Sequence, residues 1–339
     1  MSSPYIPIKI KELINETIDS KSLVFSIPEQ YREQFSYQPG QFLTLRIPRG
    51  DGFSPRCYSL ASSPFVDQDL KVSVKRVQDG HGSNWICDTL KVDDVIEVLP
   101  PSGVFCPDDL NQDFFLFAGG SGITPIMSIL KSSLHQGSGK VKVFYANKDQ
   151  DSIIFKRELE SLMKQFEGRL EIQFWLDDIS GYATAGDVKK FLPPYLAGEA
   201  FICGPGPFMN LVEGALLDLN MDSSLVHVER FISLPDEGAI QKPVSGDGHA
   251  YHLQVQLDGV THEVDGLPNE FLLDAMLRHG LGAPYACQSG VCSSCMCKVE
   301  QGEVTMLIHD CLSEKELAGG WIVACQAVAV SEHVAVRFS

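Results

Sequence analysis

The chain has 339 residues, 44% of them hydrophobic and 21% charged, with mean hydropathy near zero and a formal net charge of −17. This length predicts two or three domains, and the acidic balance argues against nucleic acid or an anionic membrane as partner. Apolar runs are too short to cross a bilayer and the N-terminus lacks signal-peptide features, so we expect a cytoplasmic protein. In that compartment clustered cysteines bind metal more often than they form disulfides.

The first segment, residues 1–108, has the pattern of an antiparallel β-barrel. Short stretches alternate apolar and polar residues, and turns containing Gly or Pro separate them. The predicted strands cover residues 22–28, 41–47, 70–77 and 94–99, with "PRGDGFSP" (48–55) as a turn.

The second segment, residues 109–232, alternates strands and helices. A nearly continuous apolar run ending in glycines is typical of a buried parallel strand, and the β-α-β-α order predicts a doubly wound parallel sheet. The predicted strands cover 113–120, 140–147 and 170–176, the helices cover 125–137 and 154–166, and a further strand–turn–helix covers 200–219.

A third segment follows residues 233–248, whose Pro, Gly, Ser and Asp content predicts a linker. In residues 249–339, Asp258-Gly259 predicts a hairpin turn. We expect a helix capped by Asn269 and ending at Gly280. A cysteine-rich loop comes after that helix.

The cysteine loop "CQSGVCSSCMCK" contains four of the chain's ten cysteines. The spacing Cys287-x4-Cys292-x2-Cys295, with Cys325 thirty residues later, is that of a plant-type 2Fe–2S site, and Cys297 falls outside it. Structural zinc usually needs two separated C-x2-C pairs, and a Rieske centre needs two histidine ligands; the loop offers neither. The remaining cysteines are expected to be small core residues: Cys57, Cys87, Cys106 and Cys311.

The stretches "APYACQSGVCSSCMCKV" (283–299) and "VACQ" (323–326) resemble plant-type ferredoxins of the β-grasp fold. This resemblance covers roughly the last ninety residues and implies that the four spaced cysteines bind the cluster.

The stretch "AGGSGITP" (118–125) ends a predicted strand and opens a helix. Glycines there let backbone amides approach a pyrophosphate at the helix N-terminus, and Pro125 suits a first helical turn. The turn alone is a weak signal, because Pro125 stands where G-x-G-x-x-G has its third glycine.

Together with that turn, "RCYSLASSP" (56–64), "VKRVQDGHGSNW" (74–85) and "CGPGPFM" (203–209) resemble the ferredoxin–NADP reductase superfamily, in its FAD-using branch. The resemblance implies that Arg56 pairs with the flavin pyrophosphate, Tyr58 packs on the isoalloxazine and Ser59 hydrogen-bonds near N5. The other residues it assigns to the cofactors are Cys57, Val74, Lys75, Arg76, Gly82, Ser83, Asn84, Gly119, Gly120, Gly122, Thr124, Pro125, Gly204 and Pro205.

The resemblance also implies a hydride-transfer site. Cys203 would lie beside C4 of the nicotinamide, and Glu229 and Phe231 of "HVERF" would lie over the flavin face. The coenzyme is left open by the residues, because Lys148 suits a 2′-phosphate whereas Asp149 opposes one. The family implies NADH, with NADPH possible.

The order flavin, nicotinamide, ferredoxin resembles the reductase components of multicomponent oxygenases, nearest in pattern to those of 3-ketosteroid 9α-hydroxylases and phenylacetyl-CoA epoxidases. A flavin joins a two-electron donor to a one-electron acceptor. The resemblance therefore implies an NAD(P)H-dependent enzyme whose partner is a terminal oxygenase, of the Rieske or the diiron type. A redox sensor with a regulatory cluster is the alternative, and it would not need the hydride site.

Overall fold

A computed structural model describes residues 5–50, 52–193, 195–230, 249–285, 288, 290, 293–309, 311–312 and 314–338. The chain divides into two compact units, residues 1–231 and residues 232–339. The predicted linker, 233–248, lies outside the described residues. Along the part of the chain that is described, no helix is both long and apolar enough to cross a membrane.

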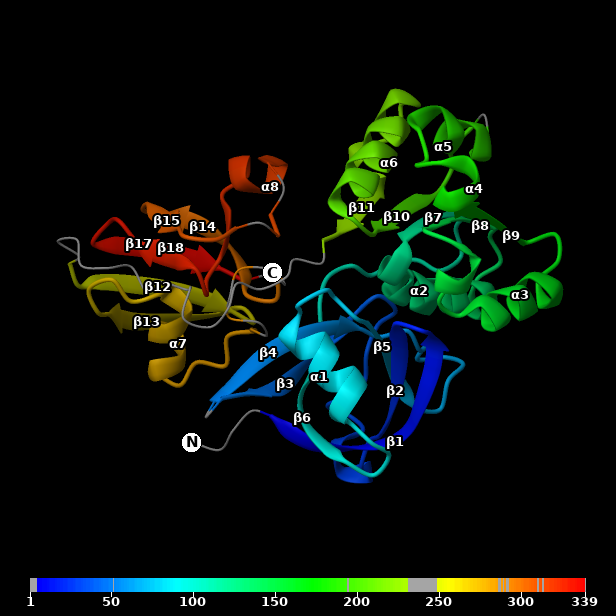
Figure 1. The fold of residues 1–339 in the computed structure, drawn as a ribbon. Helices are drawn as coiled ribbons and strands as arrows, with labels where there is room; N and C mark the ends of the chain where they lie inside the picture. The colour runs from blue at the N-terminus through cyan, green and yellow to red at the C-terminus, as the bar shows by residue number, and fades with distance from the viewer. Residues whose placement is uncertain are drawn as a thin grey trace. The chain divides into compact units, whose positions relative to one another are not determined.

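The N-terminal half of the first unit is a six-stranded antiparallel sheet with the order β4-β3-β6-β1-β2-β5. A bridge between Leu60 and Val72 brings its two edges together, so the sheet closes into the predicted barrel (Figure 1). Its apolar side chains, among them Leu43, Leu45 and Val98, fill the interior. The elements are β1 (Ile6–Thr17), β2 (Ser20–Ser26), β3 (Phe42–Arg49), β4 (Gly52–Ser59), β5 (Leu70–Lys75), α1 (His81–Thr89) and β6 (Val95–Ser102).

Two barrel strands differ from the sequence-based expectation. β1 was not predicted, although Ile8 and Ile10 are fully buried and alternate with exposed residues. The predicted turn 48–55 is wrong in extent, because β4 starts at Gly52 and pairs with β3 along its whole length. The hairpin is therefore tighter than its Gly and Pro content suggested.

The second half of this unit is a five-stranded parallel sheet with the order β11-β10-β7-β8-β9. Helices cover both faces, and each face has its own apolar core, one including Leu116 and Ile126 and the other Phe117 and Val212. This is the predicted doubly wound sheet, with β11 as an additional strand. The elements are β7 (Phe114–Gly119), α2 (Ile123–Gln136), β8 (Val141–Asn147), α3 (Lys156–Gln165), β9 (Leu170–Leu176), α4 (Asp177–Ser180), α5 (Ala185–Phe191), β10 (Glu199–Cys203), α6 (Gly206–Asp218) and β11 (Val226–Glu229).

The barrel and the α/β lobe share apolar contacts. Ala61 and Phe105, which flank the barrel strands, belong to the core under α2. The Phe105 ring lies edge-on to Phe201 of β10, with centroids 5.1 Å apart. The two lobes are therefore packed as one body rather than as separate domains.

The second unit contains a five-stranded sheet with the order β13-β12-β18-β14-β16 and a two-stranded sheet, β15-β17. Helix α7 lies against the larger sheet (Figure 1). Its buried side chains, including Leu272 and Met276, belong to the same core as that sheet. The elements are β12 (Tyr251–Leu257), β13 (Val260–Gly266), α7 (Leu272–Arg278), β14 (Met296–Gln301), β15 (Val304–Met306), α8 (Glu314–Ala318), β16 (Trp321–Val323), β17 (Ala327–Ala329) and β18 (His333–Arg337).

The hairpin between β12 and β13 and the start of α7 can be compared with the sequence-based predictions. Asp258 and Gly259 both have positive φ, 51° and 76°, as the predicted hairpin turn requires. The predicted cap is wrong: Phe271 occupies the N-cap position of α7, without a side-chain capping bond, and Asn269 lies two residues earlier with a φ of 59°. Gly280, with a φ of 76°, follows the end of the helix as expected.

Candidate functional site

The barrel residues expected to hold the flavin converge where β4 ends and α1 begins. A Cβ at Gly82 would lie 3.0 Å from Cγ of Arg56 and 3.5 Å from the hydroxyl of Tyr58. Arg56 donates to Ser54 Oγ and to the carbonyl of Pro55, and burial raises the pKa of Tyr58 well above its ordinary value. Only a glycine leaves this cradle open, which suits a pyrophosphate beside a guanidinium.

The turn before α1 is organised by side-chain bonds to the backbone. The Ser83 hydroxyl accepts from the amide of Val77 at 3.0 Å, and the Asn84 amide donates to the Val77 carbonyl at 3.1 Å. Arg76 donates to Asn84 at 3.3 Å and pairs with Asp88 at 2.5 Å. Since Ser83 and Asn84 hold the turn in shape, they preorganise the backbone amides at the helix start.

The other barrel positions are placed less directly. Ser59, 4% exposed, lies at the end of β4. Cys57 is half-buried, with Sγ 3.5 Å from the Thr44 hydroxyl. The side chain of Val74 is fully buried in the barrel, so it offers a cofactor only its backbone. Lys75 is ion-paired with Asp19 at 3.6 Å.

In the α/β lobe the two glycine-rich turns meet at the carboxyl ends of neighbouring strands. β10 pairs in parallel with β7 in a register that sets Cys203 opposite Ala118. A Cβ at Gly122 would lie 2.1 Å from the Cys203 carbonyl oxygen, and one at Gly119 would lie 2.7 Å from Cδ of Pro205. The strand order reverses between β7 and β10, and ligands of doubly wound sheets bind at such a switch point.

The first of these turns leads directly into α2. Gly120 has a φ of 54°, and a Cβ added there would have no atom within 4 Å. Thr124, 2% exposed, donates to the carbonyl of Ser121 at 3.1 Å, and Pro125 lies in the first helical turn. The open Gly120 backbone and the helix N-terminus give the cradle that a pyrophosphate requires.

Cys203 and Glu229 are brought together by strand pairing. They are partners in the parallel register of β10 and β11, so Glu229 lies on a strand. Burial, together with the Glu229 carboxylate, raises the pKa of the fully buried Cys203 thiol. Burial raises the pKa of Glu229 to about 7. The pair combines a neutral thiol with a carboxyl group that titrates near neutral pH. Phe231 lies outside the described residues.

Of the four cysteines expected to be core residues, only Cys87 is buried, and Cys57, Cys106 and Cys311 are intermediate. Cys106, on the loop after β6, is close enough to the switch point that the Glu229 carboxylate acts on it. Burial first, and then Glu229 and Asp108, raise the pKa of its thiol to about 12. Sequence reasoning did not connect Cys106 with this site, since only folding brings the loop and β11 together.

The end of β8 carries the residues expected to read the coenzyme. Lys148 is exposed, whereas Asp149 accepts from the amide of Ser152 at 2.9 Å in a capping box. The carbonyl of Lys148 accepts from the amide of Asp178, at 3.0 Å, on the segment after β9. Two further acidic residues, Asp177 and Asp178, therefore lie near Lys148 in the fold.

In the second unit, Cys295 and Cys325 lie together although thirty residues separate them. Cys295 is 2% and Cys325 3% exposed, and the Cys325 amide donates to Sγ of Cys295 at 3.4 Å. Gly290, with a φ of 77°, leaves no room for a Cβ, which would lie 2.7 Å from the Ile308 carbonyl oxygen. Buried thiols that accept amide hydrogen bonds suit an iron–sulfur cluster. Cys287 and Cys292 lie outside the described residues.

Comparison with known proteins assigns each part of the chain. Family models described as oxidoreductase FAD-binding domain, oxidoreductase NAD-binding domain and 2Fe-2S iron-sulfur cluster binding domain match residues 7–106, 116–214 and 255–330. These matches agree with the predicted cofactors, FAD, NADH and a 2Fe–2S cluster. The predicted domain bounds, 1–108, 109–232 and 249–339, stay predictions.

Several relatives and solved structures extend over nearly the whole chain. The chain is 46% identical to the ferredoxin reductase component of 3-ketosteroid-9-alpha-monooxygenase from Rhodococcus rhodochrous, covering 98% of this chain and 96% of that one. It is 31% identical to one of the subunits of 1,2-phenylacetyl-CoA epoxidase from Escherichia coli strain K12, covering 98% and 97%. The fold matches that of phthalate dioxygenase reductase with a TM-score of 0.62 and 24% identity, covering 99% and 100%.

These likenesses cover all three segments in one order, and they confirm both the predicted fold class and the predicted resemblance. The chain belongs to the family of monooxygenase ferredoxin reductase components, oxidoreductases that join FAD-binding, NAD-binding and 2Fe–2S cluster binding domains in a single polypeptide.

Proposed function

We propose that this reductase takes electrons from NADH and delivers them singly to a Rieske-type terminal oxygenase that hydroxylates a 3-ketosteroid at C9. The observation that carries this choice of acceptor is the 46% identity, over 98% of the chain, to a reductase component named for that reaction. A diiron epoxidase is the second candidate acceptor, supported by the 31% identity to the epoxidase component. The free thiols of Cys57, Cys87 and Cys203 support the cytoplasm as its compartment.

The direction of electron flow follows from the cluster types. Plant-type clusters have potentials near −400 mV, and Rieske centres lie between about −150 and +300 mV. A gap of ~250 mV favours transfer of one electron by roughly four orders of magnitude. A Rieske acceptor would therefore draw electrons from this ferredoxin domain.

The chain's own residues prepare the first step. When bound, FAD supplies the chemistry that accepts a hydride and returns electrons one at a time. Cys203 lies at the switch point, where a nicotinamide would enter, and Glu229 is its partner on the neighbouring strand β11. A nicotinamide that gives up hydride gains positive charge on its ring, and a carboxylate within a low-dielectric site stabilises that charge. The neutral thiol of Cys203 fills the strand end without adding a charge.

The pKa of Glu229 predicts how this step depends on pH. Because burial raises that pKa to about 7, the carboxyl loses its proton as pH rises through 7. We expect the rate of flavin reduction by NADH to rise over the same range, by up to about tenfold for a loss of roughly 1.4 kcal/mol of barrier. Stopped-flow reduction between pH 5.5 and 8.5 measures it.

The matching variant is Glu229→Gln, which has the same shape but does not titrate. It should keep the low-pH rate across the whole range. A wild-type profile that stays flat, or a Glu229→Gln profile that still rises, would remove Glu229 from this role.

Charge at the end of β8 supports NADH as the coenzyme. Asp149 follows Lys148 in the chain, and the bond from the Asp178 amide to the Lys148 carbonyl brings Asp177 and Asp178 near it. The carboxylates interact, since burial and the charge of Asp178 together raise the pKa of Asp177. A 2′-phosphate placed here would meet three carboxylates and one ammonium group, so repulsion outweighs attraction.

Rates of anaerobic flavin reduction, measured over a range of concentrations of each coenzyme, test the proposed donor. We expect NADH to reduce the flavin with kcat/KM at least about tenfold above that for NADPH, equivalent to about 1.4 kcal/mol. The double variant Asp177→Asn/Asp178→Asn should bring the kcat/KM values for NADH and NADPH closer together. It removes two of the negative charges that repel the 2′-phosphate of NADPH. Equal use of both coenzymes by the wild-type protein would contradict the assignment.

The acceptor needs a separate assay. Purified Rieske oxygenase and a purified diiron epoxidase, each supplied with its substrate, are compared for product formed per NADH consumed. Product from the Rieske system alone supports the proposal, and product from the epoxidase alone selects the second candidate. No bleaching of the flavin by NADH would favour the sensor alternative instead.

A further inference from the structure

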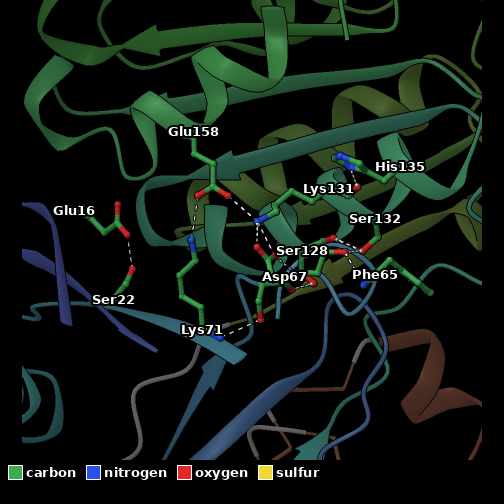
Figure 2. Close-up of polar contacts among 12 residues, drawn as sticks. Glu16, Ser22, Phe65, Asp67, Lys71, Ser128, Lys131, Ser132, His135 and Glu158 are labelled. Carbon is green, nitrogen blue, oxygen red and sulfur yellow. Dashed lines mark hydrogen bonds and ion pairs between the residues drawn. The ribbon is translucent and has the colours of Figure 1, made fainter. Parts of the chain in front are cut away.

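A cluster of charged side chains crosses the boundary between the barrel and the α/β lobe (Figure 2). Lys131 of α2 has a side chain that is only 5% exposed, and its Nζ lies 2.7 Å from the carboxylates of both Asp67 and Glu158. Glu158 of α3 also accepts from Nζ of Lys71, on barrel strand β5, at 3.1 Å. We call these four residues, Asp67, Lys71, Lys131 and Glu158, the bridging cluster. Its positive and negative charges alternate, two from each lobe.

Next to the bridging cluster, buried serines also connect residues 62–67 with α2. Ser128 of α2 donates to the carbonyl of Ser62 at 2.6 Å. Ser132 donates to the Ser128 carbonyl at 2.7 Å, which leaves its oxygen to accept from the Ser63 hydroxyl at 2.8 Å. All four serines are fully buried. Since buried hydrogen bonds are costly to break, α2 is held in one register against residues 62–67.

Residues 62–67 and α2 are each close in the chain to one of the cofactor motifs: β4 with the flavin residues, and the glycine-rich turn at the start of α2. β4 ends at Ser59, three residues before Ser62, a span of about 10 Å of extended chain. Along α2, Thr124 lies seven residues before Lys131, which is also about 10 Å. The contact between residues 62–67 and α2 therefore joins two segments that each continue into one of the two motifs.

We propose that Lys131 is a positioning residue for hydride transfer: through the bridging cluster it sets the placement of the nicotinamide-binding turn relative to the flavin-binding strand. This inference rests on the proposed function. The apolar contacts of Ala61 and Phe105 also join the lobes, but the hydrophobic effect that drives their burial is non-directional. Charge-assisted hydrogen bonds fix distance and direction.

The charge states agree with this role. Burial alone lowers the pKa of Lys131, but Glu158 and Asp67 outweigh it and raise that pKa. Burial alone raises the pKa of Glu158, but Lys71 and Lys131 outweigh it and lower that pKa. The Lys131 contribution to stability is lost only as pH rises through its raised pKa, and that of Glu158 only as pH falls through its lowered pKa. Lys131 and Glu158 are thus both charged around neutral pH.

The test compares Lys131→Met with Lys131→Arg and with the control Lys142→Met. Lys142 pairs with Glu171 at 2.7 Å within the α/β lobe and takes no part in the bridging cluster. In Lys131→Met, we expect the limiting rate of flavin reduction to fall about 10- to 100-fold. The NADH concentration at half-maximal rate and the flavin content should be unchanged. Lys131→Arg should recover most of the rate, and Lys142→Met should behave as wild type.

A second readout needs no electron transfer. Hydrogen–deuterium exchange of the flavin-free protein should quicken at residues 62–67 and along α2 in Lys131→Met, with the rest of the barrel unchanged. A wild-type reduction rate or unchanged exchange in Lys131→Met would overturn the proposal, as would equal losses in Lys142→Met. If Lys131→Met does not accumulate, Asp67→Asn is used in its place, with the same expected fall in reduction rate and the same expected rise in exchange. If NADH fails to reduce the wild-type flavin, the proposed function fails, while the exchange result still stands.

Discussion

Replacing Gly122 with alanine will lower the rate of flavin reduction by NADH about 100-fold, the loss expected when reacting groups are displaced by about 1 Å. The added Cβ would lie 2.1 Å from the Cys203 carbonyl oxygen, 2.4 Å from its carbon and 2.7 Å from the Gly204 nitrogen. All three are backbone atoms, so no side chain can turn aside. The turn must move away from β10, and with it the groups that receive the dinucleotide.

The backbone of Gly122 itself does not require glycine, because its φ of −60° and ψ of −10° are helical. The effect is therefore steric, and overpacking of this kind costs about 1–3 kcal/mol. We expect the melting temperature to fall by roughly 2–12 °C and the flavin content to stay unchanged, since the flavin motif lies on the barrel. Stopped-flow reduction and thermal unfolding measure the two effects.

The control for this change is Gly206→Ala, at the start of α6 in the same lobe. No atom lies within 4 Å of its added Cβ, so alanine should be neutral or slightly stabilising. A normal reduction rate in Gly122→Ala would mean that the two glycine turns do not form the nicotinamide site.

The parts of the fold that were predicted well are those with strong local patterns. The apolar run of β7, the helical spacing of α2 and the hairpin at Asp258-Gly259 each appear in the structure within two residues of the expected place. β1 also has such a pattern in Ile6, Ile8 and Ile10, but it was not used. Asn269 failed as a cap because the chain turns there with positive φ, which Asn tolerates nearly as well as it caps helices.

The sequence predicted the motifs of the site one by one. Their proximity in space depends on the order of the strands in the sheet. The register that sets Cys203 opposite both Ala118 and Glu229 comes from the parallel sheet. Lys131 was not predicted to have a role, because its partners Asp67 and Glu158 are 64 and 27 residues away. The local sign was present in "SILKSS", a lysine between serines on a helix that is buried on every side. The role of this lysine depends on which element packs against the helix at that position.

Replacing Cys295 with alanine will separate the two activities of the enzyme. Reduction of ferricyanide, which takes electrons directly from a flavoprotein, should stay near the wild-type rate. Reduction of cytochrome c, which needs the ferredoxin domain, should fall at least about 100-fold, because even partners that only support metal ligands are worth 10- to 100-fold. Acid-labile sulfide in the purified protein should be lost together with cytochrome c reduction.

Cys297→Ala is the matched control, two residues further along. Cys297 is also fully buried, and its thiol pKa is raised, by burial and then by Cys295, so it stays protonated. It pairs with Ile322 in the β14–β16 ladder, among the apolar side chains of the core. We therefore expect Cys297→Ala to cost stability but to keep labile sulfide and cytochrome c reduction. If both variants lose the cluster, the thirty-residue spacing to Cys325 does not define the ligands; if neither does, Cys295 is not one of them.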